Sequence, residues 1–195
     1  MRYTKGHKDN SHERILKAAA RKFRRQGIAA TGMTGVMAEA GLTNGGFYAH
    51  FRSKNDLVRE GLERALDEQP HLAQSDAAPG ELRDLIRHYL SAEHRDHPDT
   101  GCASAALLPE IGRQPRSTRK IYTARMREFF EQLARQLPQH SPSYPSHDAA
   151  IGIFAVLVGA LQLSRAVEDR SMSDAILAAG VRAANTLADT TEEKL

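Results

Sequence analysis

The chain has 195 residues, 41% of them hydrophobic and 26% charged, and a formal net charge of +3 at pH 7. This balance is typical of a globular protein of one domain or two small ones, and it excludes wholesale disorder. The single cysteine, Cys102, excludes an intrachain disulfide and a cysteine-rich zinc site. The longest uncharged apolar run, residues 149–161, is shorter than the ~18 residues of a membrane helix, so we expect a cytoplasmic protein with no membrane partner.

The charge is unevenly distributed along the chain. Residues 1–60 contain twelve Lys and Arg against five Asp and Glu, whereas residues 61–195 contain fifteen against nineteen. A basic N-terminal third indicates contact with a polyanion, although a solvated basic helix face produces the same pattern.

The chain is predicted to be helical throughout, because no segment shows sustained apolar and polar alternation between turn residues. Residues 70–80 and 138–147 are expected to be loops, since the second contains three prolines and neither is periodic. The nine helices expected in chain order are residues 11–26, 35–40, 44–50, 53–69, 82–94, 104–112, 115–136, 147–169 and 173–190.

Several of these helices have terminal signals. Asn10 with Glu13 has the spacing of a capping box before the first helix, and Gly27 suits the position just after its end. Ser53 with Asp56 forms a second capping box.

The most informative segment is residues 33–57, MTGVMAEAGLTNGGFYAHFRSKNDL. Thr34 can cap the first short helix, Gly41 permits a reversal with positive φ, and Thr43 can cap the second short helix. Two short helices joined by a glycine-containing turn form a helix-turn-helix, whose second helix can enter a DNA major groove. An ordinary helical hairpin with solvated polar residues is the alternative.

Polar side chains that can bond phosphates and base edges gather on and beside the second short helix. Lys54 falls in the first turn of the next helix, where backbone N–H groups also attract phosphate. The others are Thr43, Asn44, Tyr48 and His50.

This segment resembles the DNA-binding domain of the TetR/AcrR family of bacterial transcriptional regulators. The resemblance covers about residues 12–60, and beyond residue 60 only chain length and helix count agree. It implies an all-α fold with a three-helix helix-turn-helix domain at residues 1–52 and a helical effector-binding and dimerisation domain at residues 53–195. The matching residues are Thr34, Ala40, Gly41, Thr43, Gly45, Phe47, Tyr48, His50, Phe51, Ser53, Lys54, Asp56 and Leu57.

The resemblance implies a DNA-binding set, within which four residues contact phosphates and Thr43 and Asn44 face the groove. The phosphate contacts are Thr34, Tyr48, His50 and Lys54, and Gly45 completes the set. Two residues depart from the family pattern. Asn44 stands where lysine is frequent, and Gly46 stands where Thr, Ser or Ala is usual. Two adjacent glycines lower helix stability by ~1 kcal/mol each, so this helix is expected to depend on packing by Phe47 and Phe51.

The first helix also carries a basic run. The resemblance places parts of this helix beside the DNA backbone, while a solvated face is an equal alternative. The residues concerned are Lys17, Arg21, Lys22, Arg24 and Arg25.

The C-terminal part is implied to dimerise and to bind an effector. The helices at 147–169 and 173–190 are apolar over more than one stripe, so two from each chain would form a four-helix interface. The alternative is that both form the core of one domain.

Candidate effector-binding residues lie on the middle helices, although plain core is the alternative for each. Cys102 lies in TGCASAALLPE, which resembles a branch of the family with members that sense electrophiles or oxidants. A thiol near a helix start can be reactive, whereas a buried inert thiol is the alternative. The candidates are Cys102, Tyr89, Leu108, Tyr122 and Phe130.

An enzyme is not expected. The sequence lacks HExxH, a glycine-rich phosphate loop and GxSxG, and His94 and His97 beside two aspartates are typical of a surface turn. We expect no cofactor and no metal. The predicted function is a DNA-binding transcriptional regulator, a repressor that binds a near-palindromic operator as a homodimer and is released by a small molecule or electrophile. The alternative is a helical ligand-binding or protein-interaction module without sequence-specific DNA binding.

Overall fold

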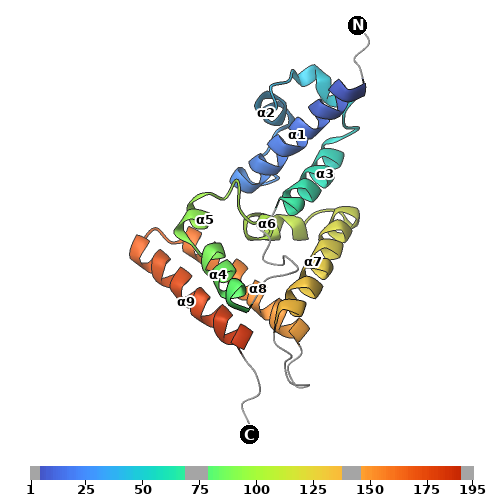
Figure 1. Ribbon diagram of the computed structural model, residues 1–195. Helices are drawn as coiled ribbons and strands as arrows, with labels where there is room; N and C mark the ends of the chain where they lie inside the picture. Colours follow the sequence, from blue (N-terminus) through green and yellow to red (C-terminus); the bar gives the residue numbers. More distant parts are fainter. Residues whose placement is uncertain (1–4, 69–78, 138–145, 190–195) are drawn as a thin grey trace. The chain divides into compact units, whose positions relative to one another are not determined.

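The computed structural model describes residues 5–68, 79–137 and 146–189, and every regular element in these ranges is helical. The expected all-α fold is therefore confirmed, with nine α-helices and one short 3-10 helix in the described residues (Figure 1). The elements are α1 (Lys5–Gln26), α2 (Met33–Glu39), η1 (Asn44–Ala49), α3 (Lys54–Asp67), α4 (Pro79–Tyr89), α5 (Ala92–Asp96), α6 (Ala103–Gly112), α7 (Arg116–Gln136), α8 (Ser146–Ala166) and α9 (Arg170–Asp189).

The chain forms two compact units that alternate along the sequence. Unit 1 comprises residues 1–69 and 98–122 and so contains α1, α2, η1, α3, α6 and the start of α7. Unit 2 comprises residues 70–97 and 123–195 and contains the other helices. The domain boundary expected after residue 52 separates a DNA-binding part from an effector-binding part, whereas the two units are defined by packing. The expected boundary therefore stays a prediction.

The core of unit 1 is formed by α1, α2, η1, α3 and α6 together. Phe23, Met37, Phe47 and Leu107 are almost completely buried, and each comes from a different helix. The α1–α3 crossing requires a glycine, because a Cβ on Gly61 would lie 2.7 Å from a ring carbon of Phe23.

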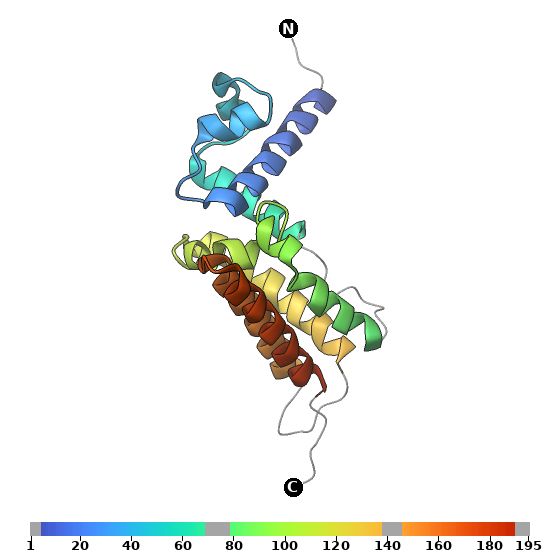
Figure 2. The ribbon, with the colours of Figure 1, turned by 90° about the vertical axis from the view of Figure 1, so that its left-hand side faces the viewer.

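Unit 2 is built around the antiparallel pair α8 and α9, which run side by side (Figure 2). A Cβ on Gly180 of α9 would lie 2.6 Å from the Cβ of Ala160 on α8, so this glycine allows their close approach. By length and composition alone α8 could cross a membrane, but 44% of its most apolar window is buried inside the protein. The core helix of a soluble protein has a similar length and a similarly apolar composition.

The single helix expected over residues 82–94 is wrong, because two helices occupy this region. α4 ends at Tyr89, and the hydroxyl of Ser91 accepts a hydrogen bond from the backbone N–H of His94 at 3.2 Å, which starts α5. The apolar pattern of Leu82, Ile86 and Leu90 continues smoothly into this point and therefore conceals the break.

Two expected caps are also wrong. α1 begins at Lys5, so Asn10 lies inside the helix rather than at its start. Gly32, not Thr34, is the N-cap of α2, and Thr34 is the second residue of that helix. The expected loop at 70–80 lies largely outside the described residues, as does most of the loop at 138–147.

Candidate nucleic-acid interface

A glycine closes the turn between α2 and η1, as the sequence predicts. Gly41 has φ +67°, and its N–H donates to the carbonyl of Ala38 at 2.9 Å, while the N–H of Leu42 donates to the carbonyl of Met37 at 2.9 Å. These two bonds form a Schellman motif, which ends a helix and turns the chain sharply.

Cations of α1 hold this turn in place. The guanidinium of Arg14 donates to the carbonyl of Ala40, the last residue of the α2 turn. Lys22 and Arg25 both contact the carboxylate of Glu39, at 3.5 and 3.1 Å. The helix-turn-helix is therefore fixed from one side by α1.

The predicted anchoring of the second short helix by phenylalanines agrees with its packing. Phe47 and Phe51 are 1% and 2% exposed, and their ring centroids lie 5.5 Å apart. His12 of α1 stacks on Phe51 with centroids 4.8 Å apart, and its Nε2 lies 3.0 Å from a carboxylate oxygen of Glu60 on α3. His12 of α1 thus contacts both α3 and the segment between η1 and α3, and the ring centroid of His50 is 6.0 Å away.

Most of the predicted DNA-binding residues share one property, which is exposure. Tyr48 is 73% exposed, although its ring packs edge-on against Phe47 at 5.2 Å, and His50 is half-buried. The remaining five are exposed: Thr34, Thr43, Asn44, Gly45 and Lys54.

The N-caps of η1 and α3 differ in their hydrogen bonding. Ser53 caps α3 as predicted, because its hydroxyl accepts the N–H of Asp56 at 3.2 Å. Thr43 occupies the N-cap position of η1, but its side chain makes no capping bond. The Thr43 hydroxyl is therefore exposed without serving the local fold.

The basic run of α1 is largely engaged within unit 1. Arg24 is buried, and it donates to the carbonyl oxygens of Asp99 and Ala65, at 2.7 and 3.2 Å, and to the carboxylate of Glu68, at 2.9 Å. Arg21 bonds the Asp99 carboxylate at 3.0 Å. Together with the pairing of Lys22 and Arg25 to Glu39, this leaves Lys17 as the member of the run that is exposed with no partner among the described residues.

The environment of Arg24 also acts on Glu68. Burial alone would raise the pKa of the Glu68 carboxyl, but hydrogen bonds from Arg24 and Arg64 lower that pKa below its usual value. Glu68 is therefore held as a carboxylate at the end of α3.

Sequence reasoning missed the role of α6, which belongs to the same packing unit as the helix-turn-helix. Ala103, Leu107 and Ile111 join the core of unit 1. The carboxylate of Glu110 accepts the backbone N–H groups of Ile28 and Ala29, at 3.1 and 2.7 Å, in the loop between α1 and α2. No local sequence signal marks this long-range packing.

The predicted effector residues in unit 1 occupy different environments. Cys102 is the N-cap of α6 and is 2% exposed, whereas Leu108 is exposed. The Tyr122 hydroxyl lies 3.1 Å from the Ser104 hydroxyl, and burial raises the pKa of Tyr122.

The remaining two candidates belong to unit 2. Tyr89 is buried, with its ring edge-on to His94 at 4.7 Å. Phe130 joins an aromatic cluster with Phe129 and Phe154, at centroid distances of 5.7 and 5.8 Å. Neither contact identifies a ligand.

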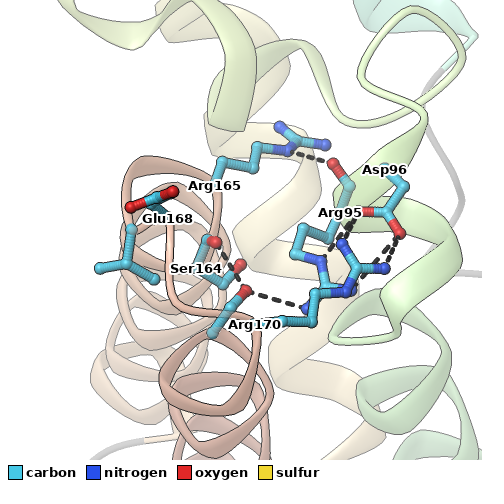
Figure 3. A pocket seen from close by; sticks show the side chains of 8 residues that line it. Arg95, Asp96, Ser164, Arg165, Glu168 and Arg170 are labelled. Atoms are coloured by element: carbon cyan, nitrogen blue, oxygen red, sulfur yellow. Dashed lines mark hydrogen bonds and ion pairs between the residues drawn. The ribbon is translucent and has the colours of Figure 1, made fainter.

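A polar pocket of about 160 Å³ lies where α5 meets the turn between α8 and α9 (Figure 3). None of the five predicted effector residues lines it. Its lining residues are Arg95, Asp96, Ser164, Arg165, Val167, Glu168, Arg170 and Ser173.

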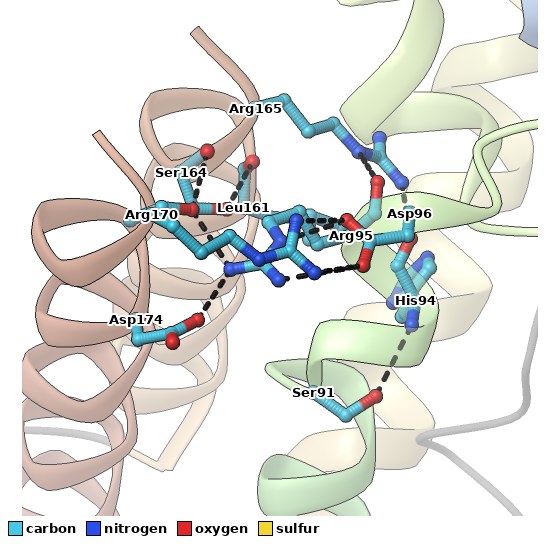
Figure 4. A network of polar contacts seen from close by, with 10 residues as sticks. Ser91, His94, Arg95, Asp96, Leu161, Ser164, Arg165, Arg170 and Asp174 are labelled. Carbon is cyan, nitrogen blue, oxygen red and sulfur yellow. Dashed lines mark hydrogen bonds and ion pairs between the residues drawn. The ribbon is translucent and has the colours of Figure 1, made fainter. Parts of the chain in front are cut away.

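The arginines of this pocket are already engaged by groups of the protein (Figure 4). Arg95 bonds Ser173 at 2.9 Å and Asp174 at 2.5 Å, and Arg170 bonds both carboxylate oxygens of Asp96 at 2.6 and 3.1 Å. Arg165 donates to the backbone carbonyls at the end of α5. This network fastens α5 to the α8–α9 turn.

Comparison with known proteins agrees with the helix-turn-helix geometry. Residues 15–60 match the model of the family described as bacterial regulatory proteins, tetR family. Over 65 residues, 33% of this chain and 32% of the relative, the sequence is 42% identical to the uncharacterised HTH-type transcriptional regulator YfiR of Bacillus subtilis. Over 85 residues, 44% of this chain and 40% of the relative, it is 32% identical to the HTH-type transcriptional regulator TtgR of Pseudomonas putida. The chain thus spans less than half the length of these curated relatives.

Solved structures match over almost the whole chain. The TetR-family regulator SCO4454 of Streptomyces coelicolor superposes with a TM-score of 0.68 at 24% identity, covering 94% of this chain and 97% of the other. Reduced NemR of E. coli gives a TM-score of 0.68 at 20% identity, covering 91% and 96%. At these identities the likeness establishes the fold.

The fold and the exposed helix-turn-helix define an all-helical protein with a helix-turn-helix in its N-terminal part. Residues 15–60 therefore match the model of the tetR family, and the chain as a whole has the fold of solved TetR-family structures.

Proposed function

We propose that this protein is a DNA-binding transcriptional regulator that represses its target genes as a homodimer. The DNA-binding part of this proposal is supported by the exposed polar side chains of the helix-turn-helix. Contacts from α1 hold the turn between its two helices in place. Thr43 and Asn44 face the bases, while Thr34, Tyr48, His50 and Lys54 bond phosphates. A regulator of this kind works at the bacterial chromosome, so we infer a cytoplasmic location.

Exposed apolar side chains on α8 and α9 support dimerisation through these helices. Leu163 and Met172 are 59% and 54% exposed, and Ile151 is 40% exposed. Exposed alanines beside them, Ala155 and Ala179 among others, permit close helix packing. Two helices from each chain would bury this surface in a four-helix interface. We propose that the resulting dimer binds a near-palindromic operator with its two helix-turn-helix motifs in successive major grooves, about 34–36 Å apart.

Release from the operator is proposed to follow binding of a small molecule or electrophile. Such an effector lowers DNA affinity by favouring a state with a different spacing of the two motifs. The residues proposed to bind the effector are Tyr89, Leu108, Tyr122 and Phe130, and Cys102 is the proposed electrophile sensor. Because Cys102 is only 2% exposed, its reaction requires α6 to open locally.

The test is selection of bound duplexes of about 30 bp, roughly three helical turns, from a random library by the full-length chain. The proposal expects an enriched near-palindrome whose binding weakens steeply with salt. Lys54→Ala should reduce the slope of log affinity against log salt by roughly 2 for a dimer, about 0.9 per lost phosphate contact.

Lys120→Ala is the matched control, since Lys120 is an exposed lysine on α7 outside the helix-turn-helix. It should leave the salt slope unchanged. If the wild-type chain enriches no sequence, DNA regulation is wrong, and the helical ligand-binding or protein-interaction module replaces it.

A further inference from the structure

The corner between α6 and α7 carries a cluster of positive side chains outside the helix-turn-helix. Residues 111–127 contain no Asp or Glu. The cations at this corner are all exposed, and the side chains of Arg113, Arg116 and Lys120 have no ion pair or hydrogen bond among the described residues. Together with the exposed Arg119, these three residues form the α6–α7 cation patch.

The acidic residues that precede the patch do not neutralise it. The carboxylate of Asp99 accepts a hydrogen bond from Arg21 at 3.0 Å, and that of Glu110 accepts two backbone N–H groups of the loop after α1 at 3.1 and 2.7 Å. Unit 1 contains seventeen Lys and Arg against ten Asp and Glu, whereas unit 2 contains ten against fourteen. The excess positive charge therefore belongs to unit 1 as a whole, and the α6–α7 cation patch is part of it.

The start of α7 gains no stability from these cations. Arg116 and Arg119 lie in its first turn, which has no acidic residue. A helix has the positive end of its dipole at the N-terminus, so cations there are unfavourable for the helix itself. The first turns of α3 and α8 instead contain Asp56 and Asp148. The arrangement at α7 is therefore better explained by an anion outside the protein.

The surface around the patch favours phosphates over a protein partner. No large apolar side chain is exposed between residues 109 and 127 of the described chain. Protein interfaces have an apolar or aromatic core, whereas contacts with a phosphate backbone are polar and strongly positive. Three of the four cations are arginines, whose planar guanidinium groups bind phosphate through two parallel hydrogen bonds.

The patch is separate from the base-reading surface of η1 within unit 1. The segment after η1 packs on the N-terminal half of α1, where His12 stacks on Phe51. α6 instead reaches the other end of α1, because Glu110 bonds the loop that follows Gln26. His12 and Gln26 lie about 21 Å apart along the helix axis, at 1.5 Å per residue. The patch begins three residues after Glu110, so it lies on the side of unit 1 away from η1.

We propose that the α6–α7 cation patch binds the phosphate backbone of a second DNA segment while the helix-turn-helix holds the operator. The inference rests on the proposed function, because a regulator bound to the chromosome is surrounded by further duplex. One bound dimer then holds two stretches of DNA, the first through base contacts and the second through phosphates alone. Binding of the second stretch is independent of its sequence and weakens with salt.

The test mixes the full-length chain with one equivalent of the selected duplex per dimer and then titrates a labelled, unselected duplex of equal length. Fluorescence anisotropy should detect binding of the labelled duplex to the wild-type complex. Changing Arg113→Gln and Arg116→Gln together should weaken that binding by about tenfold or more at low salt and reduce its salt slope by roughly 2, about 0.9 per lost phosphate contact. The affinity for the selected duplex should stay within about twofold of the wild type, since the two surfaces are separate. The melting temperature should be equal to or above that of the wild type.

The double variant Arg87→Gln and Arg135→Gln is the matched control, because it removes two exposed arginines of unit 2. It should bind both duplexes as the wild type does. Equal losses in the two double variants would overturn the inference, since net charge alone would then explain them. A wild-type complex that leaves the labelled duplex unbound would also overturn it. So would a patch variant with a lowered melting temperature or a weakened hold on the selected duplex, because the arginines would then serve the fold or the operator.

A parallel titration replaces the labelled duplex with polyglutamate of matched total charge. Tighter binding of polyglutamate than of the duplex would overturn the inference in favour of an acidic protein partner.

Selection by the wild-type chain separates this inference from the proposed function. If the wild type enriches no duplex, DNA regulation is wrong. The patch then still stands if the patch variant, but not the control, loses binding to the unselected duplex, and it falls if the patch variant keeps that binding.

Discussion

Arg24 shows how a residue counted as a candidate DNA contact can belong to the interior. Its side chain is 2% exposed and bonds three groups, from α3 and from the segment before α6. A basic run on a helix therefore contains two kinds of cation, which composition alone does not distinguish. Burial separates them, since the side chain of Arg25, one residue along, is 46% exposed.

Arg24→Met should lower the free energy of unfolding by roughly 3 kcal/mol, because it leaves buried acceptors and a carboxylate without their partner. Arg25→Met removes only an exposed ion pair with Glu39 and should cost less than about 1 kcal/mol. Urea unfolding followed by circular dichroism measures both values. Equal effects of the two variants would contradict the interior role of Arg24.

His94 makes the stability of unit 2 sensitive to pH. Burial lowers the pKa of His94 to about 4, the nearby Arg165 and His88 act in the same direction, and the bond to the carbonyl of Tyr89 partly opposes them. The unfolded chain binds this proton near the ordinary value of about 6.5. Stability is therefore complete above pH 6.5 and is lost as the pH falls from 6.5 towards 4, by up to roughly 3 kcal/mol.

Unfolding by urea at a series of pH values checks this prediction. His94→Gln should have a shallower loss of stability between pH 6.5 and 4 than the wild type. His97→Gln, which changes an exposed histidine, should keep the wild-type slope. If His94→Gln lost stability between pH 6.5 and 4 as steeply as the wild type, the pH dependence would come from other groups.

At the scale of elements, Ser53 and Thr43, the N-caps of α3 and η1, have different roles. Ser53→Ala should lower the free energy of unfolding by about 1 kcal/mol, because it removes the bond to the N–H of Asp56. Thr43→Ala should leave stability nearly unchanged, since the Thr43 side chain makes no capping bond, but should weaken binding to the selected duplex. Thermal melts and gel shifts on the two variants measure both effects.

Helix periodicity and turn glycines were sufficient to predict most elements of the fold. Gly41 has the positive φ that the turn requires, and Phe47 and Phe51 are buried as expected. Local patterns failed at Ser91, where one hydroxyl cap divides an apolar stripe that continues across the break. They also gave no sign of α6 in the core of unit 1, since that packing joins residues about eighty positions apart.

The candidate site was predictable in part for the same reason. Exposure of Tyr48 and Asn44 follows from their polarity and their spacing around buried phenylalanines. The partners of the α1 cations could not be predicted, because Glu39, Glu68 and Asp99 reach them only through the tertiary fold.

At the scale of the whole molecule, the exposed apolar residues of α8 and α9 predict self-association. Leu163→Lys should shift the chain from dimer to monomer at micromolar concentration, because a cation would be buried in the proposed interface. Ala124→Lys on the exposed face of α7 is the control and should leave the mass unchanged. Light scattering after size exclusion measures both. A dimeric Leu163→Lys would place the interface elsewhere.

The division of unit 1 into two stretches of sequence has a consequence for biosynthesis. A ribosome that has released only residues 1–69 has not yet supplied Ala103, Leu107 and Ile111, which complete the core around α1 and α3. The core of unit 1 therefore cannot form completely until the chain has been synthesised as far as residue 122. For the same reason, grafting the helix-turn-helix unit onto another protein requires residues 98–122 as well, and a fragment cut at residue 69 should melt without a cooperative transition.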